Sequence, residues 1–245
     1  MRNLWLFSTI MAGLLACQTS PTDKDSNKFI RYSSQAPTID GKGDDACWKK
    51  VKPQLMDQIW VGKLAHASDY MGKFKIRWDE QFLYILAEIY DDTLVDTHKN
   101  GLEKYWDDDC LEIFVDEDGS GGNHQYNYNA FAYHISLDSQ FVDMGTDSLP
   151  HFYKDHGSVA IRQNDKVTTW EVALRLFPDT YKDNSKNIPV LLKEGKKIGF
   201  AIAYNDNDKS VERENMMANI DVTPKPDKNR GWIDAGVFSK MELKK

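Results

Sequence analysis

The run YWDDDCLEIFVDED at positions 105–118 combines an aromatic plate with several carboxylates. Trp106 stands directly before three aspartates, Asp107 to Asp109, and Glu112 follows six residues after the tryptophan. A pyranose ring has an apolar C–H face that stacks on an indole, and its edge hydroxyls bond well to carboxylates. Because side chains an even number of residues apart share one face of a strand, Trp106 and Glu112 can line the same site. This spacing predicts a platform for a sugar.

A purely structural interpretation of the same run stays open. Trp106 would then cover the edge of a sheet, and Asp107 to Asp109 would be a solvated entrance to a strand. If the run does form a site, three adjacent like charges are expected at its rim, where water or a cation offsets their repulsion.

The loop after this run offers a candidate metal site. Its sequence, DEDGSGGN at positions 116–123, is acidic and rich in glycine. Calcium takes about six to eight hard oxygen ligands, and Asp116 and Asp118 are the candidate ligands here. The loop lacks the full spacing of an EF-hand, so a plain solvated turn is the alternative.

Signatures of catalysis are few. The chain has no GxSxG, HExxH, Walker or GxGxxG motif. Glycoside hydrolysis needs two carboxylates about 5–10 Å apart, and Glu112 with one of Asp107 to Asp109 makes such a pair conceivable. The six histidines are scattered; His151 and His156 are five apart, which suits neither one helix face nor one strand face. We expect a protein without chemistry of its own, with hydrolysis as a minor alternative.

The elements that would carry these residues are strands. Phe74, Ile76 and Trp78 alternate with basic residues, a turn follows at 79–81, and 82–90 is a second strand. Further strands are predicted at 110–116, 159–162, 170–176 and 198–205, and the strands at 159–162 and 170–176 are expected to pair as a hairpin around residues 164–165. A turn of helix is expected only near Trp48. Many short strands with polar turns predict an all-β fold, a β-sandwich of immunoglobulin-like or jelly-roll type with short helical turns.

Several segments in one order resemble family 9 carbohydrate-binding modules. The segments are TIDG at 38–41 with Asp44, Asp45 and Trp48, KIRWDEQFLYILA at 75–87, WDDDCLEIFVD at 106–116, QYNYNA at 125–130, WEVA at 170–173, GFAIAYND at 199–206 and a late Trp232. The resemblance covers most of the chain after its first 28 residues. Each segment is weak evidence alone, but their shared order is specific.

The resemblance implies a non-catalytic β-sandwich that holds a sugar between two tryptophans and carries structural Ca²⁺. Trp106 and Trp232 match the two tryptophans, Glu112 matches the carboxylate that takes sugar hydroxyls, and Asn229 lies near a polar contact position. Asn127 stands where sugar-binding members have an arginine and is our candidate contact there.

A further departure from the family is Ala203, which stands where sugar-binding members have a glutamine. Two hydrogen-bonding groups are therefore missing or moved, which predicts weak affinity and a ligand other than the usual glucose-type ends. Related sandwiches hold haem through His or Met, and His134 with Met144, Met216 or Met217 is a minor alternative.

The N-terminus predicts export. Arg2, an apolar run and Leu14-Leu-Ala-Cys17 resemble a lipoprotein signal, with residues 1–16 removed and Cys17 lipidated. An ordinary secretory signal is the alternative. Residues 17–28 are polar and predict a flexible tether, followed by one domain over 29–245. We therefore expect a lipid-anchored protein of the cell envelope, at the outer membrane or cell surface, where Cys47 and Cys110 either bridge or stay free.

Composition narrows the partners. A formal net charge of −7 argues against nucleic acid, and 41% hydrophobic residues describe a folded globular chain. The expected partner is an oligo- or polysaccharide, with the membrane reached through the lipid anchor only and with other glycan-handling envelope proteins as further partners. Capture or catabolism of polysaccharide would follow. The main alternative is a sandwich whose site has decayed or serves a structural or protein-binding role.

Overall fold

The computed structural model describes residues 28–222 and 229–245, and nearly all of their regular structure is β. The strands are β1 Phe29–Tyr32, β2 Gln54–Met56, β3 Gln58–Val61, β4 Tyr70–Trp78, β5 Leu83–Asp91, β6 Cys110–Asp116, β7 Phe131–Ser136, β8 Phe141–Met144, β9 Pro150–Phe152, β10 Gly157–Asn164, β11 Val167–Leu174, β12 Lys197–Asp206, β13 Asn215–Ala218 and β14 Ser239–Lys244. Three 3₁₀ turns, η2 Ala46–Trp48, η3 Lys154–His156 and η4 Ala235–Val237, complete the described elements.

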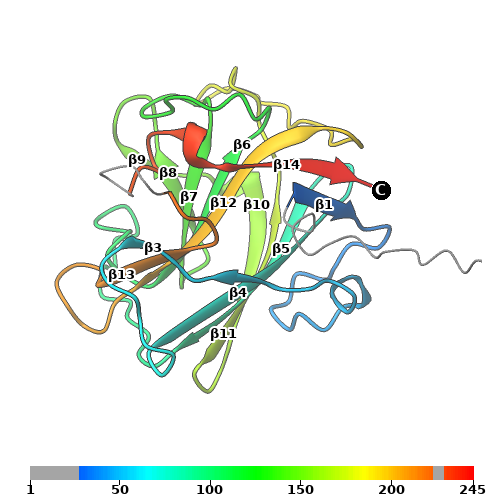
Figure 1. The fold of residues 1–245 in the computed structure, drawn as a ribbon. Helices are drawn as coiled ribbons and strands as arrows, with labels where there is room; N and C mark the ends of the chain where they lie inside the picture. The colour runs from blue at the N-terminus through cyan, green and yellow to red at the C-terminus, as the bar shows by residue number, and fades with distance from the viewer. Residues whose placement is uncertain (1–27, 223–228) are drawn as a thin grey trace, which may run out of the picture.

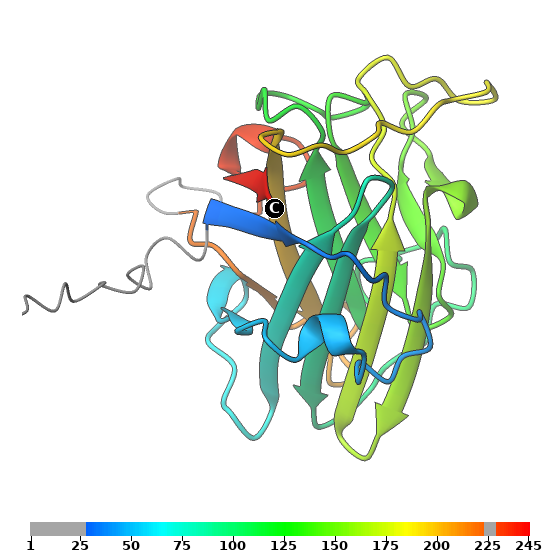
Figure 2. The same ribbon diagram turned by 90° about the vertical axis from the view of Figure 1, so that its right-hand side faces the viewer.

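The strands form one continuous sheet that folds over into two layers (Figure 1). Strands β10, β11, β5 and β4 make one layer, and β14, β12, β6, β7, β8 and β9 make the other. Between them, β1 pairs in parallel with both β4 and β14 and joins the layers. The turn η3 connects the edge strands β9 and β10 of the two layers, at the right-hand side of Figure 2. This architecture confirms the predicted β-sandwich.

The two layers pack through large side chains that alternate along each strand. Phe74 of β4 lies 6.0 Å from Phe200 of β12, and Tyr70 stacks on Tyr204 at 5.7 Å between ring centroids. Burying such rings dominates the stability of a sandwich of this size. The predicted hairpin at 74–90 is confirmed as β4 and β5, and the predicted turn at Trp48 is confirmed as η2.

Strand β6 presents opposite faces to the core and to the outside of the sandwich, as its sequence predicts. Leu111, Ile113 and Val115 belong to the central core, whereas Phe114 belongs to a second apolar cluster on the outer face. Glu112 lies on that outer face and is 1% exposed. The strand is therefore covered on both sides, and its single carboxylate at mid-strand must be compensated by close partners.

The two described cysteines are free thiols. Cys47 is half-buried, while Cys110 is buried at the start of β6, where the side-chain amide of Asn205 lies 3.2 Å from its sulfur. Of the two arrangements that the sequence left open, the structure shows the unbridged one.

Candidate carbohydrate-binding site

Glu112 forms the centre of a polar cluster on the outer face of β6. His134 stands directly opposite it on β7, and the Nε2 atom of His134 lies 3.0 Å from Glu112 Oε1. A guanidinium nitrogen of Arg213, from the segment between β12 and β13, lies 3.1 Å from the same oxygen. Asn205 of β12 donates to it at 2.5 Å. Three strands and a loop thus meet at one carboxylate oxygen.

The charge on Glu112 is stabilised by these neighbours. Burial by itself raises the pKa of a carboxyl group, but His134 and Arg213, together with the bond from Asn205, hold the pKa of Glu112 below its usual value. The group is therefore an ionised, positioned acceptor within a dry surrounding, which is the state that strengthens hydrogen bonds to hydroxyl groups.

Both predicted tryptophans are exposed, Trp106 by 39% and Trp232 by 38%. Trp106 lies edge-on to Tyr105 at 4.9 Å, and Tyr105 in turn lies edge-on to His134 at 4.7 Å. This chain of contacts places Trp106 at the Glu112 end of the outer face.

Trp232 follows a glycine that packs against the other end of the same face. A side-chain carbon added at Gly231 would lie 2.4 Å from Trp60 and 2.9 Å from Phe114, two strand positions beyond Glu112. The imidazole of His124 contacts the Gly231 carbonyl at 2.8 Å and holds this segment in place. Trp106 is thus linked by ring contacts to the Glu112 cluster, and the residue before Trp232 packs on Phe114 of the same strand face.

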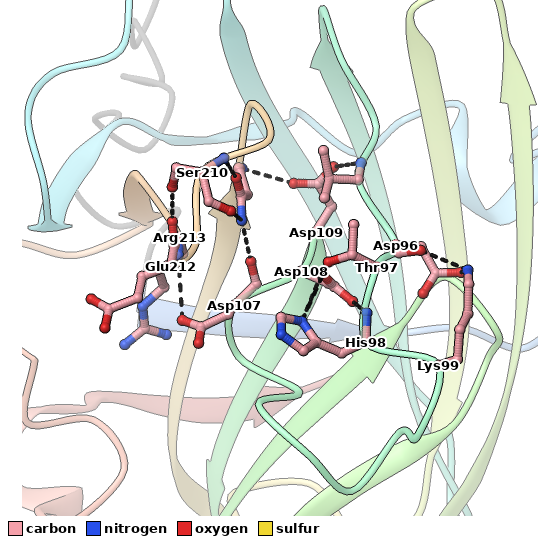
Figure 3. A network of polar contacts seen from close by, with 12 residues as sticks. Asp96, Thr97, His98, Lys99, Asp107, Asp108, Asp109, Ser210, Glu212 and Arg213 are labelled. Atoms are coloured by element: carbon pink, nitrogen blue, oxygen red, sulfur yellow. Dashed lines mark hydrogen bonds and ion pairs between the residues drawn. The ribbon is translucent and has the colours of Figure 1, made fainter.

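The three aspartates after Trp106 differ from the expectation of a solvated rim, because all three are buried. Their carboxylates bond to two segments, 95–98 after β5 and 207–213 after β12 (Figure 3). Asp107 accepts from the backbone N–H of Arg213, Asp108 accepts from Thr97 and from the backbone of His98, and Asp109 accepts from the backbone of Val95 and Asn207. These like charges coexist because each carboxylate accepts hydrogen bonds of its own from these two segments, which fixes the surroundings of Trp106.

Asp109 also belongs to a buried carboxylate triad that the sequence did not reveal. Asp91 at the end of β5, Asp109 before β6 and Asp206 at the end of β12 each offer an oxygen, and these oxygens lie within 4.8 Å of one another. Burial raises the pKa of Asp91 to about 6, of Asp206 to about 7 and of Asp109 to about 9. Repulsion from the Asp91 carboxylate adds to this effect of burial on the pKa of Asp109 and Asp206.

The triad fits a hard divalent cation. Asp206 Oδ1 has no hydrogen-bond partner among the described residues, although Asp206 is only 2% exposed. A buried carboxylate oxygen without a partner is costly, and three convergent carboxylates are ligands that calcium prefers. Sequence reasoning missed this group because its members are 18 and 97 residues apart and converge only where three strands end.

The predicted loop ligands Asp116 and Asp118 do not join this triad. The two oxygens of Asp116 accept from the backbone N–H groups of Gly119 and Gly121, at 3.0 and 2.7 Å. Asp118 accepts from the backbone N–H of Ser120 at 2.8 Å. These bonds explain why an acidic loop is compatible with a tight turn, and calcium at this loop stays a prediction.

Comparison with known proteins adds to this geometry. Residues 39–245 match the family model described as carbohydrate family 9 binding domain-like. The chain belongs to this family. Endo-1,4-beta-xylanase C of Paenibacillus barcinonensis is 30% identical over 180 residues, which are 74% of this chain and 14% of that protein. Endo-1,4-beta-xylanase A of Thermotoga maritima is 26% identical over 214 residues, 84% of this chain and 17% of that protein.

The same fold occurs in solved family 9 modules. A carbohydrate binding module family 9 from Caldicellulosiruptor kristjanssonii in complex with cellotriose superposes with a TM-score of 0.63 at 20% identity, over 89% of this chain and 93% of that one. Its complex with glucose gives the same TM-score at 21% identity. This chain spans only about a sixth or less of the xylanases it matches, so their similarity concerns one module of a larger enzyme.

Asn127 and Ala203 are the two positions at which this family 9 domain departs from the expected family pattern. The side-chain amide of Asn127 contacts oxygens of Asn123 and Gln125, and its own oxygen accepts from the backbone of Asn129, so it supports its own loop. Ala203 is fully buried in the outer apolar cluster. Neither residue supplies a polar group beside Glu112. Arg213, from a different segment, does so.

The remaining candidate residues are placed as follows. Asn229 is half-buried and lies three residues before Trp232. Both ring nitrogens of His134 have contacts within the protein, with Glu112 at 3.0 Å and with the Ala132 carbonyl at 3.2 Å. Since an axial haem ligand needs a free nitrogen, this histidine is not available to haem iron in this arrangement.

Proposed function

We propose that this family 9 domain binds a saccharide without catalysing its breakdown, with one sugar ring between Trp106 and Trp232 and with Glu112 as an acceptor for its hydroxyls. The observation that supports the proposal is that Trp106 and Trp232 are both exposed, while the nearby Glu112 is buried and held ionised by its neighbours. Their exposed ring faces offer apolar area that the C–H face of a sugar can cover.

The chemistry of the cluster suits a polyhydroxylated ring. Indole faces stack on the apolar C–H surface of the ring, while Glu112 accepts from hydroxyl groups and Arg213 donates to them. In this domain the guanidinium comes from the loop before β13. We infer that the hydrogen-bonding pattern of the site, and hence its preferred sugar, differs from that of modules with an arginine and a glutamine at the positions of Asn127 and Ala203.

The affinity should be modest. Only part of the family's polar contacts is present, and Glu112 already accepts hydrogen bonds from neighbouring side chains of the protein. We therefore expect a dissociation constant between about 10 μM and the millimolar range. Cellotriose and glucose, the sugars named for the solved modules, are the first ligands to try. Xylan fragments follow from the xylanase relatives.

Alanine substitution tests the site. Trp106→Ala or Trp232→Ala should weaken binding roughly ten- to a hundredfold, because each indole contributes on the order of 1–3 kcal/mol. The measurement is calorimetry against mono- and oligosaccharides, with circular dichroism as the folding control. Leu55→Ala, which truncates a side chain that is 60% exposed on β2, is the matched control and should leave affinity unchanged. If both tryptophan variants fold and bind a sugar as tightly as the wild type, the assignment fails.

A non-catalytic role is tested separately. The protein incubated with xylan and with cellulose should release no reducing sugar above a blank. Release that disappears in Glu112→Gln would instead favour a glycoside hydrolase.

We further propose that calcium supports the fold and that its main site is the triad of Asp91, Asp109 and Asp206. The unpartnered oxygen of Asp206 and the convergence of three carboxylates support this placement. The bound cation would hold together the ends of three strands next to Trp106. The loop ligands Asp116 and Asp118 are the alternative site, and the experiment that separates the two is developed below.

The proposed location is the cell envelope. The signal at 1–16, Cys17 and most of the tether lie outside the described residues, so they stay predictions. Within the described residues, no helix is long and apolar enough to span a membrane. Two or more acyl chains at Cys17 would give stable anchoring. Wild-type protein should therefore fractionate with membranes, and Cys17→Ala should release it; equal retention of both would refute the anchor.

A further inference from the structure

A cavity lies beside η3, where the chain passes from the edge strand β9 of one layer to the edge strand β10 of the other. Its volume is about 570 Å³, and it is lined by β9 and η3, by the end of β11 and by the loop over 177–189. In Figure 2 this loop runs across the upper ends of the strands, above η3. A cavity of this size is large enough for one or two sugar rings.

The cavity is independent of the tryptophan site, because the sheet separates them. Adjacent residues of a strand point to opposite faces. On β7, His134 faces the outer side with Glu112, whereas Tyr133 belongs to the central core and contacts His156 of η3. His156 lines the cavity. The two sites thus use different faces and share no residue.

His156 provides a directed polar group on the wall of the cavity. It is 2% exposed, its Nδ1 lies 2.6 Å from the Tyr133 hydroxyl, and its Nε2 has no hydrogen-bond partner within the described residues. Burial, with the nearby charge of Arg175, lowers the pKa of His156 to about 3, so the imidazole is neutral. If the Tyr133 hydroxyl donates to Nδ1, the tautomer has its proton on Nε2, and that N–H lacks an acceptor.

A carboxylate supplies an acceptor in the same cavity. Asp183 accepts a hydrogen bond from the Tyr128 hydroxyl, which also lies 3.1 Å from the Tyr153 hydroxyl. Arg175 and Lys154 add cationic donors, and Asp155 adds a second carboxylate, so these four charged side chains sum to zero. Balanced charges favour a neutral ligand over an anion or a cation.

Aromatic surface completes the cavity. Phe177 stacks on the His156 ring at 4.1 Å between centroids, and Tyr181 lies edge-on to it at 5.0 Å. Phe152 also lines the cavity and is 39% exposed. Aromatic faces with a carboxylate acceptor and an N–H donor on the same wall match a ring that is apolar on its face and hydroxylated at its edge.

We propose that this cavity is a second saccharide-binding site, one that holds a neutral pyranose unit through its edge hydroxyls, with an oxygen of the sugar accepting from His156 Nε2 and a hydroxyl donating to Asp183. The ring packs against Tyr181 and Phe152. A polysaccharide could then engage one protein at two places, which raises its apparent affinity by increasing the effective concentration at the second site.

The test isolates the cavity from the tryptophan site. In a Trp106→Ala/Trp232→Ala double variant, saturation-transfer NMR with glucose, xylose, galactose, mannose and arabinose should still detect binding of at least one of these sugars. Asp183→Asn or Tyr181→Ala added to the double variant should weaken that binding about tenfold or more, since each removes a contact worth roughly 1.4 kcal/mol. Leu55→Ala is again the matched control.

The outcomes are distinguishable from those of the first site. Loss of all signal in the folded double variant overturns the second site while leaving the first intact. Binding that persists in both Asp183→Asn and Tyr181→Ala overturns it as well. If Tyr181→Ala unfolds, Asp183→Asn alone decides, because it retains the shape of the side chain. A shift of the His156 Nε2 proton on titration with the bound sugar is the direct readout, and an unshifted proton refutes the proposed contact.

Discussion

Replacing Asp206 with asparagine should change the stability of the domain in opposite directions with and without calcium. In the absence of a cation, burial and the neighbouring carboxylates raise the pKa of Asp206 from 3.8 to about 7. A pKa difference of about 3 corresponds to roughly 4 kcal/mol against the ionised form. Because the folded pKa is raised, this cost is absent at low pH, grows between about pH 4 and 7, and is complete above that.

Asp206→Asn removes one of the three charges. Asp206 Oδ2 accepts from the side-chain amide of Asn215 at 3.2 Å, and the new amide can keep that bond through its oxygen while donating to Asp91 or Asp109. In chelator at pH 7.5, the variant should therefore melt above the wild type, by up to the roughly 4 kcal/mol that the ionised carboxylate costs.

Calcium should reverse this order. A cation that binds only the folded wild type stabilises it by about 2.7 kcal/mol at a hundred times its dissociation constant. For a chain of this length, that corresponds to a rise in melting temperature of roughly 5–11 °C. The variant, with a ligand lost, should gain much less. The assay is calorimetric melting with chelator and with millimolar Ca²⁺, together with elemental analysis of the purified protein.

The control separates the two candidate calcium sites. Asp118→Asn alters the loop site only and should keep the full calcium response of the wild type. If Asp118→Asn loses the response while Asp206→Asn keeps it, calcium belongs to the loop and our reasoning about the triad is wrong. If the wild type shows no response after exhaustive chelation and contains no calcium, both sites are excluded.

Three further predictions concern stability. Glu112 should stabilise the fold above about pH 4.5, because its folded pKa is lowered, and this contribution should disappear as the pH falls through the folded value; Glu112→Gln should flatten the acid limb of the melting curve, and an unchanged limb would contradict this. Gly231→Ala should cost about 1–3 kcal/mol in chemical denaturation, since the added carbon meets Trp60 at 2.4 Å. Reductant should leave the melting temperature unchanged, because Cys47 and Cys110 are free; a drop would indicate a bridge.

The sequence by itself predicted the long strands β4, β5, β6, β10, β11 and β12 and the two faces of β6. The alternation of residue types predicts which side of a strand faces the core, as in 74–78, 111–115 and 198–204. A single segment is sufficient for this, because side chains of a strand alternate between its two faces every two residues. The order of weak motifs was sufficient to predict a family 9 sandwich and the positions of Trp106, Glu112 and Trp232. None of these inferences needed a contact between distant residues.

Only the tertiary structure decided how the polar groups combine. Asp107 to Asp109 looked like a solvated rim, yet each is buried and accepts hydrogen bonds from loops that are distant in the sequence or precede β6, and Asp109 meets Asp91 and Asp206 at the ends of three strands. Arg213 reaches Glu112 across 101 positions of the chain. The reason is physical: a charge is tolerated inside a protein according to the partners that surround it, and those partners come from segments whose proximity is created by strand pairing and has no local pattern in the sequence.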